Sequence, residues 1–142
     1  MALVENRKAY FNYEILETLE AGLELKGFEV KAIVSGKMSL AGARVKIYNN
    51  EAWLVSASIA PYQQNNVPEE YDQERPRRLL LHKDQIAHLL GVSQEKGLTI
   101  VPIKLYNKNN KIKIEIAIGR GKKKQDKRES IKKREAKREM RR

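Results

Sequence analysis

The side chains of this chain that could do chemistry are mostly Lys and Arg, and they gather at its C-terminal end. Residues 119–142 hold thirteen of the 29 Lys and Arg but only four of the 18 Asp and Glu, so they carry +9 of the total net charge of +11. Basic side chains bind phosphates, and a localised basic segment with a pI near 9.8 is typical of nucleic-acid-binding proteins. The chemistry that we expect is therefore the binding of a polyanion.

Catalytic and metal-binding patterns are weak by comparison. The chain has no Cys, and its two histidines, His82 and His88, stand outside any Cys or acidic cluster with metal-ligand spacing. Residues 119–122 resemble a phosphate-binding loop only faintly, because the upstream Gly and the following Ser or Thr are missing. We predict neither an enzyme, nor a metal site, nor a cofactor.

The basic tail has a composition that favours helix but no apolar face. From residue 126 onward it consists largely of Lys, Arg, Glu and Ala and lacks Gly and Pro. Its three apolar residues, Ile131, Ala136 and Met140, do not share one side of a helix. A helix of this length is marginal alone in water. We predict that the tail is disordered in the free protein and becomes helical against a polyanion. The alternative is a tail that serves solubility only.

Residues 1–118 are nearly neutral and predict one small β-rich domain. Alternating apolar residues predict strands, and Asn-rich turns connect two pairs of them as hairpins. The predicted strands cover 23–34, 43–48, 52–59, 98–106 and 111–118. No β-α-β alternation is present. The expected fold is mainly β, a small antiparallel OB-fold-like barrel with one to three short flanking helices and a basic C-terminal tail.

Several local features of this domain are predicted more specifically. Apolar residues between 15 and 19 predict a short helix that ends at Gly22, and residues 82–90 predict a second helix that ends at Gly91. A switch of the apolar face at residues 26–27 indicates a β-bulge, which would leave Glu29 and Lys31 on a partly wet face. Residues 61–78 predict a long polar loop.

The sequence also bears on the compartment. The N-terminal residues lack the apolar core of a signal peptide, and no apolar run approaches the roughly 20 residues of a membrane span. The absence of Cys fits a reducing cytoplasm. We therefore expect a cytoplasmic monomer without a membrane partner.

Basic residues outside the tail could extend the binding surface. Arg7 and Lys8, then Lys26 and Lys31, and finally the residues from 120 to 124 could converge on one edge of a barrel and bind phosphates. Tyr10 and Phe11 could stack on unpaired bases or pack as structural aromatics.

Five strings, in order and spacing, resemble the SsrA-binding protein (SmpB) family: N-R-K-A (6–9), E-A-G-L-E-L-K-G-F-E-V-K (20–31), L-L-L-H (79–82), G-x-T-x-V-P (97–102) and G-K-K-K-Q-D-K-R-E (121–129). The resemblance runs from about Asn6 to Arg138. It implies a barrel that binds transfer-messenger RNA (tmRNA) and delivers it to stalled ribosomes for trans-translation. It also implies that the tail occupies the decoding centre and the empty mRNA channel of the small subunit, where it folds into a helix.

The resemblance and the basic residues together give two sets of candidate residues. The candidate RNA-binding residues are Asn6, Arg7, Lys8, Lys26, Gly27, Glu29, Val30, Lys31, Arg120, Gly121, Lys122, Lys123 and Lys124. The candidate ribosome-engaging residues of the tail are Asp126, Lys127, Arg128, Lys132, Lys133 and Arg134. For Glu29 the alternative is a structural salt bridge. For the chain as a whole, the alternative is a ribosome-associated structural RNA-binding protein.

Overall fold

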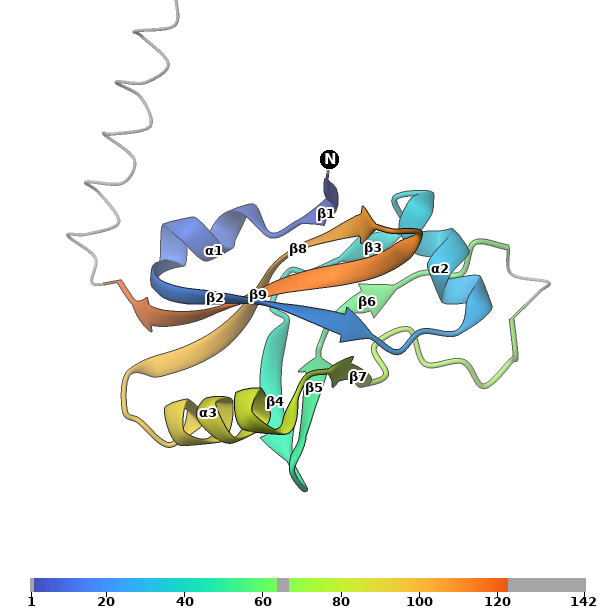
Figure 1. The fold of residues 1–142 in the computed structure, drawn as a ribbon. Coiled ribbons are helices and arrows are strands. Elements are labelled where there is room, and N and C mark those ends of the chain that lie inside the picture. The colour runs from blue at the N-terminus through green and yellow to red at the C-terminus, as the bar shows by residue number, and fades with distance from the viewer. Residues whose placement is uncertain (1, 64–66, 123–142) are drawn as a thin grey trace, which may run out of the picture.

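The computed structural model describes residues 2–63 and 67–122. Seven antiparallel strands form one sheet in the order β1-β8-β9-β2-β7-β5-β4, and β3 and β6 form a small second sheet. Strand β4, at one end of this order, lies against β8 near the other end, so the large sheet curves into a partly closed barrel (Figure 1). The prediction of a mainly β, OB-fold-like barrel is confirmed.

Nine strands and three helices make up the described part of the chain. The strands are β1 (Ala2–Glu5), β2 (Tyr13–Leu23), β3 (Met38–Ser39), β4 (Arg44–Tyr48), β5 (Glu51–Val55), β6 (Ser58–Ile59), β7 (Arg77–Leu80), β8 (Leu98–Lys108) and β9 (Lys111–Gly121). The helices are α1 (Arg7–Asn12), α2 (Gly27–Val34) and α3 (Lys83–Ser93). Helix α3 packs on β4 and β8, while α1 packs on β2 and β8.

The long β8–β9 ribbon is buried on both faces over part of its length, which fixes the position of α1. One face of β9 presents Ile114, Ile116 and Ile118 to the main core, and the alternation in sequence predicted this. The other face presents Ala117, which packs in a smaller cluster with Ala9 of α1. Each buried aliphatic side chain contributes about 1.5–3 kcal/mol relative to exposure.

Both predicted hairpin turns are confirmed. Asn49 and Asn50 have φ angles of 50° and 59°, and Asn109 and Asn110 have φ angles of 52° and 62°. Tight hairpins of this kind need two residues with positive φ, and Asn tolerates that conformation better than other residues with side chains.

The strand predicted over 23–34 is wrong beyond its first residue. Strand β2 ends at Leu23, and the residues from Gly27 onward form α2. The switch of the apolar face near residue 26 marks the start of a helix rather than a bulge. Phe28, Ala32 and Ile33 follow helical spacing, and the last two are fully buried.

The helix predicted from residue 15 to Gly22 is also wrong, because these residues belong to β2. They pair with β9 along nearly their whole length. Three apolar residues do not distinguish one helical turn from a strand, and pairing with β9 decides the outcome. Gly22 does not end a helix; it pairs with Leu80 of β7, and a Cβ at Gly22 would lie 3.1 Å from the Leu80 Cβ.

Three element boundaries differ from the prediction. Helix α3 continues to Ser93, so Gly91 lies inside it. The strand predicted over 52–59 is interrupted at Ser56, whose φ of 63° separates β5 from β6. Strand β9 continues to Gly121, three residues past the predicted end of that strand at residue 118.

Gly119 is a glycine that close packing requires. It faces Ile15 of β2, and a Cβ at Gly119 would lie 2.9 Å from the Cβ of Tyr13, closer than real Cβ atoms approach. We expect Gly119→Ala to lower the free energy of unfolding by about 1–3 kcal/mol in urea denaturation, because β2 must shift. Gly121→Ala, which adds a Cβ to open space, should change it by less than about 0.5 kcal/mol. Equal stability of the two variants would refute the packing argument.

Candidate nucleic-acid interface

Asn6 holds the N-terminal segment on the barrel. Its backbone N–H donates to the carbonyl of Ile103 at 2.8 Å, and its side-chain Nδ2 donates to the carbonyl of Pro102 at 2.9 Å. Its own carbonyl accepts a hydrogen bond from Ala9 in the first turn of α1. Asn6 therefore positions α1 on β8, and its side-chain amide is already engaged in the free protein.

Arg7 and Lys8 follow Asn6 and point away from the barrel. Both are exposed. The Arg7 side chain is 90% exposed, and its Nε lies 3.7 Å from a Glu5 carboxylate oxygen. An ion pair this exposed and this long contributes little, so the Arg7 guanidinium is available to a phosphate.

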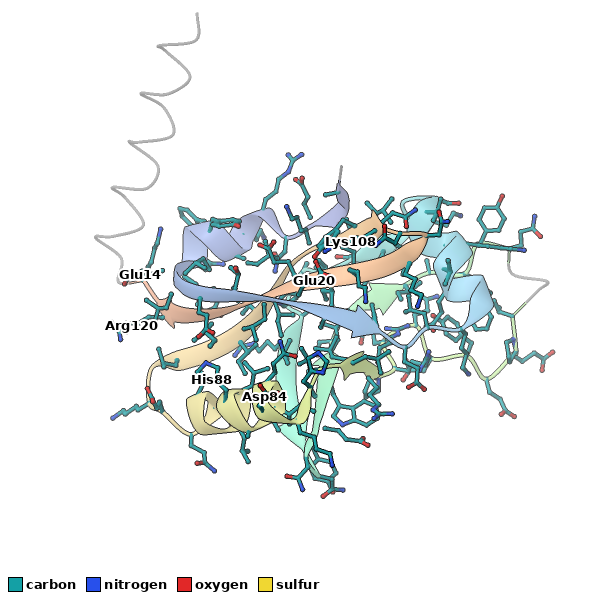
Figure 2. The ribbon with its side chains drawn as sticks, in the orientation of Figure 1. Glu14, Glu20, Asp84, His88, Lys108 and Arg120 are labelled. Carbon is teal, nitrogen blue, oxygen red and sulfur yellow. The ribbon has the colours of Figure 1, made fainter. Side chains whose placement is uncertain are left out.

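The end of β9 is tied to the end of α1. The Lys122 backbone N–H donates to the Asn12 carbonyl at 2.9 Å, and its Nζ donates to the Tyr10 carbonyl at 3.0 Å. Arg120 lies opposite Glu14 of β2, at the same end of the sheet (Figure 2). We call the residues brought together here the α1–β9 surface; they are Arg7, Lys8, Arg120, Gly121 and Lys122.

The candidate residues of α2 form a separate surface. Lys26, Gly27, Val30 and Lys31 are all exposed. Helix α2 and α1 lie at opposite ends of the β8–β9 ribbon (Figure 1). The expectation that all the basic residues converge on one edge is therefore wrong, because the segment after residue 26 is a helix that leads away from β2.

Among the candidate RNA-binding residues that the structure describes, Glu29 alone is completely buried. Its Oε2 accepts hydrogen bonds from Arg77 Nη2 at 2.7 Å and Nε at 3.0 Å, and Arg75 binds both carboxylate oxygens. Its Oε1 accepts the Lys26 backbone N–H at 2.9 Å. In this conformation Glu29 forms the structural salt bridge that was its alternative interpretation, and its contact with RNA stays a prediction.

The Glu29 cluster joins α2 to the long loop that precedes β7. The Tyr71 hydroxyl lies 3.0 Å from Glu29 Oε2, and the Tyr71 ring meets Phe28 edge-on with centroids 4.8 Å apart. Burial raises the pKa of Tyr71 to about 12, with the neighbouring carboxylate adding to the shift. Burial alone would raise the pKa of Glu29, but hydrogen bonds from Arg75, the Lys26 backbone and Arg77 outweigh it and hold that pKa at about 2.

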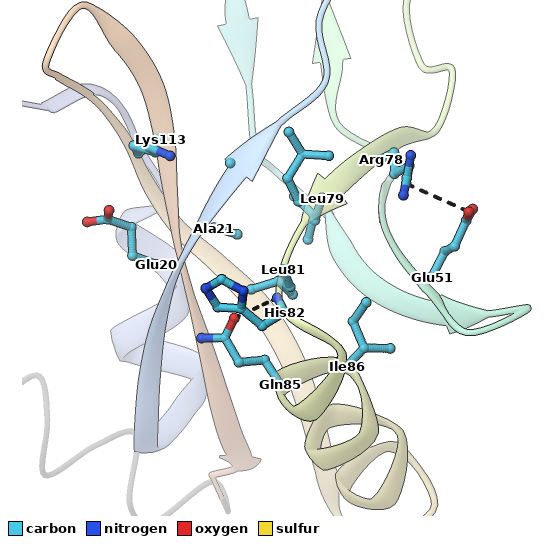
Figure 3. Close-up of a pocket in the computed structure, with 12 residues that line it drawn as sticks. Glu20, Ala21, Glu51, Arg78, Leu79, Leu81, His82, Gln85, Ile86 and Lys113 are labelled. Carbon is cyan, nitrogen blue, oxygen red and sulfur yellow. Dashed lines mark hydrogen bonds and ion pairs between the residues drawn. The ribbon is translucent and has the colours of Figure 1, made fainter.

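A cavity of about 410 Å³ opens between β2, β7 and the start of α3 (Figure 3). Arg78, Lys113 and His82 line it together with Leu80, which is 49% exposed. An exposed Leu among basic and imidazole groups suits contact with a nucleotide, whose base is apolar on its faces and whose phosphate is anionic. Sequence reasoning did not select this hollow, although the L-L-L-H string at 79–82 supplies part of its lining.

Glu20, on the rim of this cavity, is neutralised by its neighbours rather than free. The Tyr106 hydroxyl donates to Glu20 Oε2 at 2.5 Å, and Lys108 Nζ lies 3.3 Å away (Figure 2). The hydrogen bond from Tyr106 and the charge of Lys108 lower the pKa of Glu20, while burial raises the pKa of Tyr106. The carboxylate is thereby less repulsive to RNA phosphates than an isolated Glu would be.

The remaining candidate residues fall outside residues 2–63 and 67–122. These are Lys123, Lys124, Asp126, Lys127, Arg128, Lys132, Lys133 and Arg134. Among the residues that the structure describes, no three His, Cys, Asp or Glu side chains gather as metal ligands would. In that same part of the chain no helix has the length and apolar character to cross a membrane.

Comparison with protein families gives a match over almost the entire chain. The model of the SmpB protein family matches residues 3–142. The SsrA-binding protein of Thermosynechococcus vestitus is 50% identical over 140 residues, which cover 99% of this chain and 92% of that protein. The SsrA-binding protein of Persephonella marina is 52% identical over 135 residues, which cover 95% of this chain and 88% of that protein.

A solved structure gives the same result at the level of the fold. A chain in the structure described as "tmRNA-SmpB: a journey to the center of the bacterial ribosome" is 40% identical and superimposes with a TM-score of 0.70. The alignment covers 90% of this chain and 93% of that chain.

Proposed function

The chain belongs to the SmpB family, and from this membership we propose that it binds tmRNA and delivers it to stalled ribosomes for trans-translation. The observation that carries the proposal is the nearly full-length match to SsrA-binding proteins at about half identity, together with the likeness to a chain of a tmRNA–SmpB ribosome structure. The protein acts by binding, in the cytoplasm and as a monomer, without a reaction of its own.

The structure supports a division of labour between barrel and tail. The α1–β9 surface gathers cationic side chains on a rigid part of the barrel, which suits a folded RNA backbone. The same surface lies where β9 ends, so the tail begins beside it. We propose that the barrel binds tmRNA and that the tail occupies the decoding centre and the empty mRNA channel.

The experiment that tests this function identifies the bound RNA. The tagged full-length chain is purified from cells and the RNA that copurifies is sequenced. We expect one dominant species that resembles a transfer RNA and contains an internal reading frame. Ribosomal RNA recovered at unit stoichiometry would indicate a structural protein of the ribosome and would contradict the proposal.

Phosphate contacts at the α1–β9 surface should appear in the salt dependence of binding. We expect Lys8→Ala and Arg120→Ala each to reduce the slope of log affinity against log salt by about one counterion, because each removes one phosphate contact. The slope is measured by filter binding of tmRNA at salt concentrations from about 50 mM to about 300 mM.

Lys111→Ala is the matched control for this experiment. Lys111 is exposed and begins the same strand, nine residues from Arg120, which is about 30 Å along an extended chain. Its removal should leave the slope unchanged. An equal effect of all three substitutions would mean that RNA responds to total charge and not to this surface. Lys31→Ala in the same assay tests the α2 surface, whose contacts with RNA stay a prediction.

A further inference from the structure

We propose that the outer face of the β4–β5 hairpin holds a stacking site for one unpaired base of tmRNA, formed by Tyr48 and Trp53 with Lys46 beside them. The inference rests on the proposed function and adds to it a surface that contains none of the candidate RNA-binding residues above. Its ligand is a nucleotide whose base lies against the aromatic side chains and whose phosphate is held by basic side chains.

The site is a shallow hollow of about 380 Å³. Its lining is Lys46, Ile47, Tyr48, Trp53, Val55 and Pro76. This volume falls within the range of small-ligand sites, which is about 300–1,000 Å³, and such sites are mostly apolar with a few polar groups. Two aromatic rings and one ammonium group in one hollow match the apolar base and the anionic phosphate of a nucleotide.

The register of three strands places the aromatic and basic residues in one row. Lys46 of β4 pairs with Trp53 of β5, and Trp53 pairs in turn with Arg78 of β7. Side chains of directly paired residues lie on the same face of a sheet. Tyr48 shares that face because it is two residues from Lys46. Unpaired bases of any type stack on aromatic side chains of this kind, while neighbouring basic side chains bind the phosphate backbone of the nucleic acid.

The two aromatic side chains are not explained by the needs of the barrel alone. Tyr48 is 70% exposed, so it contributes little to the core. The buried indole Nε1 of Trp53 has no hydrogen-bond partner among residues 2–63 and 67–122. Most buried indole N–H groups have such a partner. Within the described residues, no hydrogen bond to Nε1 therefore fixes the orientation of the indole ring.

The wall opposite the hairpin is fixed in advance. Pro76 stands between Arg75 and Arg77, and both guanidinium groups bind the buried carboxylate of Glu29. The hairpin itself is closed by a turn whose two Asn residues have positive φ. A site whose walls are already ordered loses less conformational entropy when a ligand binds.

The charge around the hollow favours RNA over an apolar protein segment. Arg44, Lys46 and Arg78 are exposed on this face, and the carboxylates of Glu24 and Glu51 each lie 3.8 Å from the Arg78 guanidinium. Arg78 also lines the cavity of Figure 3, so the row of basic and aromatic side chains continues into that hollow. Because this row reaches the cavity of Figure 3, we infer that the ligand of the site is the same RNA that the barrel binds.

Trp53 is the only Trp of the chain, so its fluorescence reports on this site without a label. We expect titration of the full-length protein with tmRNA to quench the Trp53 emission at the concentrations where binding occurs. We expect Tyr48→Ala to weaken tmRNA binding about tenfold, since a stacked base of this kind is worth roughly that factor or more. Tyr48→Phe keeps the ring and should bind like the unaltered protein.

Tyr62→Ala is the matched control, because Tyr62 is 44% exposed and does not line the hollow. It should leave both affinity and quenching unchanged. Normal affinity of Tyr48→Ala together with unquenched Trp53 would overturn the stacking site while leaving tmRNA binding intact. Quenching by ribosomes but not by tmRNA would overturn it in favour of a ribosomal partner. Failure of the unaltered protein to bind tmRNA would refute the proposed function and this inference together.

Discussion

A chain that ends at Gln125 should bind tmRNA nearly as tightly as the full chain and yet fail to rescue stalled ribosomes. The truncation keeps the barrel, the α1–β9 surface and the basic residues up to Lys124. It removes residues 126–142, which contain nine Lys or Arg and four Asp or Glu. If the barrel supplies the RNA contacts and the tail enters the mRNA channel, the affinity for tmRNA falls by less than about tenfold, because the cations that contact RNA phosphates are kept. Tagging of incomplete peptides stops.

Tagging of a truncated reporter protein in a reconstituted translation system measures the second effect, and filter binding measures the first. The control is a full-length chain in which the order of residues 126–142 is scrambled, so that charge and length are unchanged. We expect the scrambled chain to fail in rescue as well, because a defined helix needs its side chains at defined positions. A loss of tmRNA affinity by orders of magnitude on truncation would mean that the tail is the main RNA anchor.

The sequence predicted the class of fold and both Asn-rich hairpins, because those features depend on local spacing and on the φ angles of a few residues. Its predictions of a helix from residue 15 to Gly22 and of a strand over 23–34 were wrong. In β2 the outcome depends on pairing with β9, a segment about a hundred positions later. In α2 it depends on Glu29, whose buried position needs Arg75 and Arg77. No local pattern contains either contact.

The candidate RNA-binding residues also divide into those whose exposure follows from local sequence and those whose position depends on distant contacts. Arg7, Lys8 and Arg120 are exposed, as expected of basic residues, and the contact between Lys122 and α1 brings their segments together. Glu29 differs from these residues. As part of a predicted strand with alternating charges, it was expected on a partly solvent-exposed face. In the structure it lies in a helix, and its carboxylate faces the buried guanidinium of Arg77. The aromatic hollow on β4 and β5 was missed because Tyr48 and Trp53 become neighbours only when the hairpin pairs.

Glu29→Gln should destabilise the fold by about 3–5 kcal/mol, the usual effect of removing one partner of a buried ion pair. Arg77 is completely buried, and its guanidinium would lose its countercharge. Urea denaturation at neutral pH measures the change. Glu24→Gln is the matched control, since Glu24 also faces an Arg but at 3.8 Å and with its side chain 64% exposed. That variant should change stability by less than about 0.5 kcal/mol.

A second substitution separates loss of the charge pair from loss of packing. We expect Arg77→Met in the Glu29→Gln background to recover part of the lost stability, because it removes the unpaired buried cation. The coupling between the two positions should then be large and of opposite sign to the single effects. Additive losses in the double variant would show that the two side chains contribute independently, and the buried pair would not be the link between α2 and the loop.

Acid should remove the contribution of Glu29 in a defined range of pH. The folded pKa of about 2 lies below the ordinary value of 4.5, so between these values the unfolded chain binds more protons than the folded chain. The stability that Glu29 contributes is complete above about pH 5, falls as the pH drops through 4.5, and is lost near pH 2. The stability difference between the unaltered protein and Glu29→Gln should shrink over that same range, whereas a difference independent of pH would show that Glu29 acts through its shape and not through its charge.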